Sequence, residues 1–519
     1  MRRASSRSCS ALSRGVSLIS RRYVSRQRSE EMGGLLVWGP RGPETRAADR
    51  LSPDGVLTKK QTPIASRLKS FPSLPSPCYL PAVTADRPLE VIVVETAFAP
   101  LLGQQSAPFC RLANSLLAER ERHWSKGDLY RLAHAANELE SFLDDHGAKF
   151  NRSFSLIREL VASVRWLSLA GFSLSHLESR LESYGLGASL SEKEAGSLRA
   201  SLGSSRFFLQ RSSVELLSRL RQDFSRLGAA WDNGAEAAET NDFDAIRRRL
   251  PRNIGQDEPA DDTQRIAEIA SKYISACTML EGLGIQRLEV AQDRRRKIAA
   301  ICKEEQARVY EATVHNLQST YDTYIKNTVV EAKDDRLPRL RGHLSAALHL
   351  LETTTVLAHF LERHELEVRG DSSGRAIASL VDGDQVQALM LNELLVWADI
   401  LMQRGRSTAE ALLPTYMELR ELRVELPPHL KLHARPAALI VNIVAHHGTP
   451  VELEVDGKRC NAGSILEVLI AVGSHPEART YVFRGDVKPL QDIGALFGGS
   501  LGEDGLENLP ASLHYLRSR

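Results

Sequence analysis

A short alternating segment near the C-terminus, followed by a tight turn, most strongly limits the folds open to this chain. Residues 451–455 alternate apolar and acidic side chains, which is the period of a strand with one buried face. Asp456-Gly457 follows directly, and this dipeptide favours the two-residue turn of a β-hairpin. The return strand is expected to begin at Lys458. The sequence therefore predicts paired antiparallel strands in this part of the chain.

The hairpin lies between further predicted elements. A first strand is expected at 422–426, an apolar helix at 437–445, a second helix at 464–472, a strand at 479–484 and a last helix at 486–497. The order is strand, helix, hairpin, helix, strand, helix. This order predicts an α+β open-faced β-sandwich, in which helices cover one face of a mainly antiparallel sheet.

The heptapeptide 432–438, Leu-His-Ala-Arg-Pro-Ala-Ala, places a histidine and an arginine at the start of the first of these helices. A helix N-terminus offers unpaired backbone N–H groups and the positive end of the helix dipole, and both favour a phosphate dianion. Pro436 is suited to opening a helix, because its missing N–H would be unpaired there anyway. The arrangement is that expected of a histidine that carries a phosphoryl group. The alternative is that His433 and Arg435 cap an ordinary helix.

The segment from about Glu421 to Phe497 resembles the HPr family, the small phosphocarriers of the bacterial phosphoenolpyruvate-dependent sugar phosphotransferase system. Three motifs in the family's order carry this resemblance: Leu432-His433-Ala434-Arg435-Pro436-Ala437, Val455-Asp456-Gly457-Lys458 and Asn461-Ala462-Gly463-Ser464-Ile465-Leu466. The resemblance implies an HPr-like fold for residues 421–500, and it covers only this part of the chain.

The resemblance also implies roles for individual residues. His433 would accept a phosphoryl group from an enzyme I-like donor protein and pass it to a receiving protein that the sequence does not identify. Arg435 would hold the phosphate oxygens, since its planar fork of N–H donors fits them, and the backbone N–H groups of Ala437 and Ala438 would add partial positive charge. No cofactor is implied. The protein would be a phosphoryl carrier rather than a turnover enzyme, because another protein must recharge its histidine. Whether it counts as an enzyme is left open by the resemblance.

The second helix of this segment carries two further expectations. Ser464 matches the serine that a dedicated kinase phosphorylates in some family members, and it also fits as an N-cap. Ile465, Leu466 and Leu469 match an exposed apolar patch used for partner docking, or they pack the helix onto its own domain. Lys431 and Glu467 depart from the family pattern, and the stretch from Ser464 is one residue longer than usual. These departures bear on docking and on kinase control.

The remaining chain predicts a large all-α region in front of this domain, because amphipathic helical patterns recur from about residue 109 to 421. Ser125 is placed to cap one of these helices, and Pro414 is expected in the first turn of a short helix that ends near residue 420. Strict heptads are not sustained, so a helical bundle or an elongated array is expected rather than a coiled coil. No known family is recognised here.

The predicted division of the chain follows these patterns. It comprises a mostly disordered, basic, Pro- and Ser-rich extension (1–104), a helical region (105–231), a polar acidic linker (232–263), a second helical region with long helices (264–420), the HPr-like domain (421–500) and a C-terminal tail (501–519).

Composition and the lack of other motifs exclude several classes of function. The net charge of +2 gives no nucleic-acid signature, and nucleic acid is not expected as a partner. Six scattered cysteines without a CxxC pair, and histidines such as His359 and His364 on different helix faces, predict no metal site. No apolar run is expected to span a membrane, so a soluble, cytoplasmic protein is predicted.

Two functions remain open from the sequence. The first is a histidine phosphoryl carrier or phosphorylation-responsive regulator, with the helical region as its output module. The second is a degenerate HPr-like protein-binding module on a helical scaffold that never carries phosphate. The intact pair His433 and Arg435 favours the first function, whereas the altered second helix and the unusual fusion to a long helical region favour the second.

Overall fold

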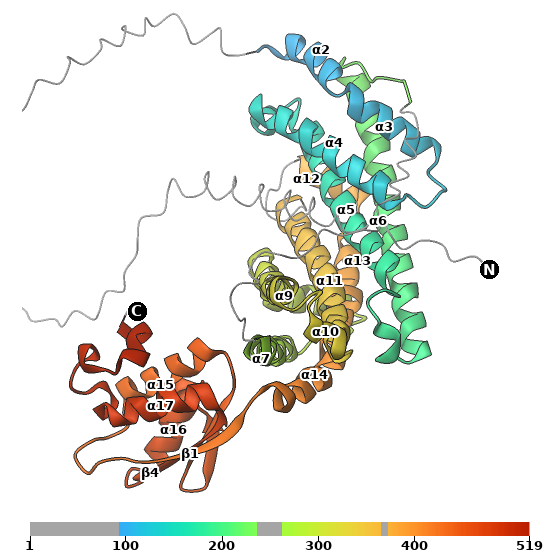
Figure 1. The fold of residues 1–519 in the computed structure, drawn as a ribbon. Helices are drawn as coiled ribbons and strands as arrows, with labels where there is room; N and C mark the ends of the chain where they lie inside the picture. Colours follow the sequence, from blue (N-terminus) through green and yellow to red (C-terminus); the bar gives the residue numbers. More distant parts are fainter. Residues whose placement is uncertain (1–92, 236–261, 365–371, 518–519) are drawn as a thin grey trace, which may run out of the picture. The chain divides into compact units, whose positions relative to one another are not determined.

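A computed structural model describes residues 93–235, 262–364 and 372–517 (Figure 1). The predicted N-terminal extension lies outside the described residues up to residue 92, and the predicted linker lies outside them from 236 to 261. Within the described part, helix α2 begins at Glu95, ahead of residue 105 where the helical region was expected to start. The division of the chain into six segments stays a prediction.

Helices account for most of the described chain from residue 95 to 416. The α-helices are α2 (Glu95–Gln105), α3 (Ala107–Ala118), α4 (Lys126–Asp145), α5 (Ser155–Arg180), α6 (Glu192–Arg226), α7 (Asp262–Glu281), α8 (Ala291–Ile301), α9 (Glu304–Tyr324), α10 (Val329–Lys333), α11 (Arg336–His364), α12 (Ser372–Leu380), α13 (Gly383–Ala388) and α14 (Val396–Tyr416). A π-helical turn, η3 (Leu389–Leu395), joins α13 to α14, and the short 3-10 turns η1 (Ala148–Phe150) and η2 (Leu186–Ala188) flank α5.

The two central helices of this region are α5 and α11. Helix α5 packs against α4, α6 and α11, while α11 also packs against α9 and α14. By length and composition alone, both helices are long and apolar enough to cross a membrane. No apolar run of this kind was expected from the sequence. Both are largely buried among the other helices. A helix that is apolar on nearly all sides is buried either in lipid or in the core of a large protein, and here it lies in a core.

A buried cluster of charged side chains lies between α4 and α5. The Arg158 guanidinium contacts Asp144 through two nitrogens at 2.8 Å each, Glu140 at 3.0 Å and Glu159 at 3.2 Å. Arg165 forms a second ion pair with Glu140. Of these side chains only that of Asp144 is well exposed. Buried charges are retained only when they are paired, so this cluster depends on each of its members.

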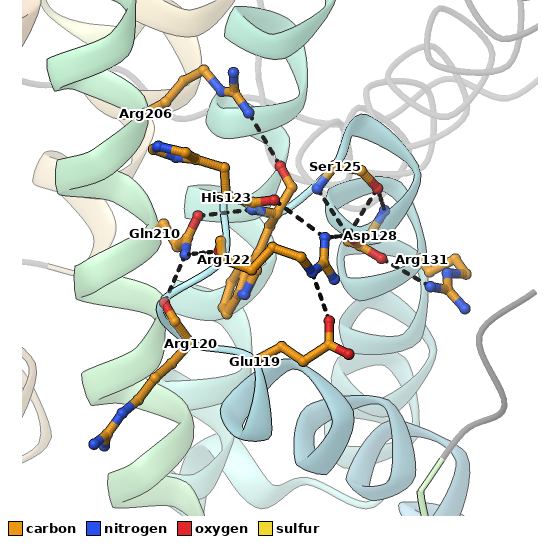
Figure 2. Close-up of polar contacts among 10 residues, drawn as sticks. Glu119, Arg120, Arg122, His123, Ser125, Asp128, Arg131, Arg206 and Gln210 are labelled. Atoms are coloured by element: carbon orange, nitrogen blue, oxygen red, sulfur yellow. Dashed lines mark hydrogen bonds and ion pairs between the residues drawn. The ribbon is translucent and has the colours of Figure 1, made fainter. Parts of the chain in front are cut away.

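The loop between α3 and α4 is fixed by hydrogen bonds at both of its sides (Figure 2). Ser125 is the N-cap of α4: its hydroxyl accepts from the Asp128 N–H at 3.1 Å, and the Asp128 carboxylate accepts from the Ser125 N–H at 2.8 Å. This reciprocal pair is a capping box, and it confirms the predicted cap. On the other side, the Gln210 amide of α6 accepts from the Trp124 N–H and donates to the carbonyl oxygens of Arg120 and Arg122.

Replacing Ser125 by alanine should loosen the first turn of α4, because one buried N–H group loses its acceptor. Loss of an N-cap costs about 1 kcal/mol, so local opening should become roughly fivefold more frequent. Hydrogen–deuterium exchange of peptides from the first turn of α4 measures this directly. Ser191→Ala removes the equivalent capping box of α6 and should leave α4 unchanged. Unaltered exchange in Ser125→Ala would show that the cap does not hold this turn.

The C-terminal domain has the α+β architecture that the sequence predicts. Its strands are β1 (Leu419–Glu425), β2 (Val451–Val455), β3 (Lys458–Asn461) and β4 (Thr480–Asp486), and its helices are α15 (Ala434–His447), α16 (Ile465–Ser474) and α17 (Val487–Gly498). The sheet order is β1-β4-β2-β3, and all neighbouring strands are antiparallel. The three helices cover one face of this sheet (Figure 1). The fold class is therefore a large all-α region followed by an open-faced α+β sandwich.

Strand alternation explains why the sheet has one buried face. Leu453 of β2 lies opposite Phe483 of β4, and both are completely buried under the helices. On the other face, Arg484 of β4 pairs with Glu421 of β1 at 2.9 Å and Glu454 of β2 at 2.6 Å. The predicted hairpin turn has φ of 47° at Asp456 and 81° at Gly457. Two consecutive positive φ values match the turn that Asp-Gly favours.

Residues after α17 form part of the same domain core. Three short 3-10 turns follow the helix: η4 (Ser500–Gly502), η5 (Leu506–Asn508) and η6 (Ala511–Arg517). Leu501, Leu513 and Leu516 are buried in the same cluster as Ile440, Phe483 and Leu496. The Tyr515 ring stacks on His446 of α15 at 3.7 Å between ring centroids, and its hydroxyl donates to Asp492 of α17 at 2.6 Å. The tail is thereby fixed onto α15 and α17.

Candidate functional site

His433 stands at the junction between a fixed loop and the start of α15. The neighbouring Leu430 and Leu432 are buried in the domain core, whereas the His433 ring is exposed. Arg479 donates to the carbonyl oxygens of Pro427 at 3.2 Å and Leu430 at 3.0 Å, which holds the loop in place. The histidine is therefore presented to solvent on a backbone that is anchored on both sides.

His433 is the N-cap residue of α15. Its backbone is extended, and its Nδ1 accepts a hydrogen bond of 3.4 Å from the N–H of Arg435. The helix begins at Ala434, so Pro436 lies within the first turn and not at its first position. Because Nδ1 accepts from an N–H group, its lone pair points toward the helix N-terminus. A phosphoryl group on Nδ1 would lie next to the positive end of the helix dipole.

The backbone N–H groups of the first turn have different partners. The Ala437 N–H donates to the His433 carbonyl oxygen at 3.0 Å, which is the first hydrogen bond of the helix. The Arg435 N–H already faces the imidazole, and Pro436 has no N–H to give. The amide nearest to a group on Nδ1 is thus that of Arg435. The roles of the Ala437 and Ala438 amides in phosphate binding stay predictions.

Two exposed cations flank this histidine. Arg435 and Lys431 both have exposed side chains, and neither forms an ion pair within the part of the chain that the structure describes. A guanidinium without an ion-pair partner is able to bind an incoming anion in bidentate fashion. On the far side of the ring, His433 Nε2 lies 3.2 Å from the Glu503 carboxylate. Sequence reasoning missed Glu503, because no local pattern links a residue of the tail to a histidine seventy positions earlier.

Ser464 is the N-cap of α16. Its hydroxyl accepts from the Glu467 N–H at 3.4 Å, and the Glu467 carboxylate accepts from the Asn461 N–H at 3.0 Å. Glu467 thus fastens the turn before α16 to its first helical turn. A phosphate on Ser464 would replace the capping hydroxyl and lie close to this carboxylate, so like-charge repulsion would oppose it. Modification of Ser464 by a kinase stays a prediction.

An apolar patch is exposed on α16. Ile465, Leu466 and Ile470 are 42%, 66% and 51% exposed. Leu469 is half-buried and packs against the domain core. Helix packing within the domain therefore accounts for Leu469 but not for Ile465 and Leu466. Ile470 is four residues after Leu466, so the helical spacing of the sequence could have indicated it as a member of this patch.

No group of three or more His, Cys, Asp or Glu side chains in the described ranges is arranged to hold a metal ion. His359 and His364 of α11 are both buried and contact Glu304 at 3.0 Å and Glu159 at 2.6 Å, respectively. Burial lowers the pKa of His359, although the adjacent Glu304 carboxylate acts in the opposite direction. These two histidines belong to the core of the helical region. His433, by contrast, is exposed and lies in the C-terminal domain.

Comparison with known protein families places this geometry in context. Residues 421–475 match the family model described as PTS HPr component phosphorylation site. The C-terminal domain is thus similar to the HPr component of the phosphotransferase system, which suggests a phosphocarrier-type role. The matched segment contains His433, Arg435 and Ser464 and ends before β4, whereas the helical region matches no family model. A search of curated proteins and a search of solved structures found no match.

Proposed function

We propose that this protein is a histidine phosphoryl carrier or phosphorylation-responsive regulator of a bacterial sugar phosphotransferase system, and that His433 accepts the phosphoryl group from an enzyme I-like donor. One observation carries the proposal: an exposed imidazole caps the N-terminus of α15 with Nδ1 directed toward the Arg435 N–H. The HPr-like match of the same segment supports the donor class. A phosphotransferase role would place the protein in the cytoplasm, beside its partner proteins.

The transfer step follows from the orientation of the ring. The Nδ1 lone pair attacks the phosphorus atom of the donor, the P–Nδ1 bond forms, and the bond between phosphorus and donor breaks with its electron pair left on the donor. The proton stays on Nε2. The phosphate oxygens would then lie near the Arg435 N–H, with the Arg435 guanidinium and the exposed Lys431 ammonium to balance their charge. Onward transfer is the same step in reverse, with a receiving protein as the nucleophile.

The apolar patch on α16 is the proposed docking surface for these proteins. Ile465, Leu466 and Ile470 expose apolar area on a small domain, and the burial of such area is a main source of binding energy. A regulatory role is favoured over bulk sugar uptake, because a carrier fused to a large helical region diffuses slowly between partners. The alternative function, a degenerate module that binds protein without carrying phosphate, would use the same patch.

Replacing Arg435 by alanine should slow phosphorylation of His433 without abolishing it. A hydrogen bond from a charged group contributes about 1.5–3 kcal/mol, so the rate should fall roughly ten- to a hundredfold. Arg435→Lys should restore part of the rate, since it keeps the charge but loses the planar fork. Arg423→Ala, at an exposed position of β1 in the same domain, is the control. Equal rates for Arg435→Ala and Arg423→Ala would exclude Arg435 from phosphate binding.

The function is tested by incubating the full chain with enzyme I of a bacterial phosphotransferase system and labelled phosphoenolpyruvate. A free-standing HPr serves as the positive control. The account expects label that is lost in acid and retained in alkali, as a phosphoramidate requires. If HPr is labelled and this chain is not, the proposed transfer from an enzyme I-like donor is wrong, and the result favours the binding-module alternative or a different donor kinase.

A further inference from the structure

The tail that follows α17 directs one carboxylate at the imidazole of His433. Glu503 Oε1 lies 3.2 Å from His433 Nε2, on the opposite side of the ring from the Arg435 N–H. This oxygen is shielded from solvent and has no hydrogen-bond partner among the residues that the structure describes. A shielded carboxylate oxygen is costly unless a positive group compensates it. The imidazole of His433, 3.2 Å away, supplies that charge only when its ring becomes cationic.

The backbone of the tail is built to hold Glu503 at this place. Ser500 and Leu501 have φ of 53° and 57°, a conformation that costs roughly 1–2 kcal/mol for a residue with a side chain. Complete burial of the Leu501 side chain offsets this cost. Gly502 follows with φ of 73°, and a Cβ there would lie 3.1 Å from Leu439 of α15. Glycine adopts this turn without the strain that a side chain would add, and it avoids a tight contact with Leu439.

Hydrogen bonds close the turn on both sides of Glu503. The Glu503 N–H donates to the Ser500 carbonyl oxygen at 3.0 Å, and the Gly505 N–H donates to that of Gly502 at 3.3 Å. Further along the tail, the Arg517 guanidinium donates to the Leu506 carbonyl oxygen at 3.0 Å. The carboxylate is therefore carried on an ordered turn.

We propose that Glu503 is a positioning residue for phosphoryl transfer at His433, an inference that rests on the proposed function. A carboxylate beside Nε2 favours the tautomer with the proton on Nε2, which leaves the Nδ1 lone pair free for attack. As the P–Nδ1 bond forms, positive charge develops on the ring, and the Glu503 carboxylate, 3.2 Å from Nε2, stabilises that charge electrostatically. No proton leaves the ring in this step, so the carboxylate acts by its charge and direction alone. The matched family segment ends at residue 475, so this group belongs to the part of the domain beyond the match.

The first test is the effect of the Glu503 charge on reactivity. Glu503→Gln keeps the shape of the side chain and removes its charge, and Glu507→Gln makes the same change at an exposed position of the same tail. Labelling of the full chain with phosphoramidate as a small donor, in about 0.5 M NaCl, screens long-range repulsion of the anionic donor. Glu503→Gln should label His433 roughly tenfold more slowly than the wild type, and Glu507→Gln should match the wild type. Equal or faster labelling of Glu503→Gln would overturn the proposal.

The second test needs no phosphoryl donor, so it separates this proposal from the proposed function. In the full chain labelled with ¹⁵N-histidine, the His433 ring signals are identified by their absence in His433→Ala. We expect a protonated Nε2 and an unprotonated Nδ1 in the wild type and in Glu507→Gln, with displaced ring signals in Glu503→Gln. Unchanged His433 signals in Glu503→Gln would refute the contact even if the chain carries phosphate. Displaced signals in a chain that no donor labels would support the contact and refute the carrier function.

Discussion

His433→Ala is expected to remove all phosphoenolpyruvate-dependent label from the protein. The variant lacks the imidazole that caps the N-terminus of α15, and alanine has no group that accepts phosphate. The fold should persist, because the His433 side chain is exposed and contributes no packing to the core. Scintillation counting of the full-length band after incubation with enzyme I measures the loss.

A second histidine gives a matched control for this result. His429 is exposed on the same loop, four residues before His433, and it does not cap a helix. His429→Ala should be labelled as fully as the wild type. Label that survives in His433→Ala and disappears in His429→Ala would move the acceptor to the other histidine.

Arg158→Met should strongly destabilise the helical region. Methionine keeps much of the volume but leaves the buried carboxylates of Glu140 and Glu159 without the guanidinium that they share. Breaking a buried ion pair by removing one partner costs about 3–5 kcal/mol. Tryptophan fluorescence during unfolding in guanidinium chloride measures the loss of stability in the helical region and not in the C-terminal domain, since none of the five tryptophans lies in that domain.

Arg211→Met controls for the general effect of this substitution. Arg211 lies on an exposed position of α6, and surface substitutions usually change stability by less than about 0.5 kcal/mol. The unfolding midpoint of Arg211→Met should therefore stay near that of the wild type. If Arg158→Met unfolds at the same denaturant concentration as Arg211→Met, the buried cluster does not stabilise the bundle.

The C-terminal domain could be predicted closely from sequence because its signals are local. The alternation at 451–455, the Asp-Gly turn and the apolar helices each specify their own segment, and together they leave few arrangements of one sheet. The contact between Glu503 and His433 depends instead on how the tail returns across α15. Nothing in the sequence near either residue indicates the other, so this half of the candidate site was missed.

In the helical region, the sequence predicts that helices are present. It predicts less well where each helix ends and which other helices it contacts. Pro414 lies in the last turn of α14, and not in the first turn of a separate short helix as expected. Pro414 cannot donate to the carbonyl four residues before it, yet the helix continues to Tyr416, so the predicted helix start at this point was wrong. The apolar faces of α5 and α11 indicate burial but do not specify neighbours. The ion pairs of Arg158 with α4 follow only once those helices are placed together.

Intact mass spectrometry of the full chain after incubation with enzyme I and phosphoenolpyruvate tests the central claim most directly. The account predicts that the wild-type protein gains the mass of one phosphoryl group, that mild acid removes it, and that fragmentation assigns it to His433. A wild-type chain of unchanged mass, in a reaction where free-standing HPr is fully phosphorylated, would contradict the claim that His433 carries phosphate.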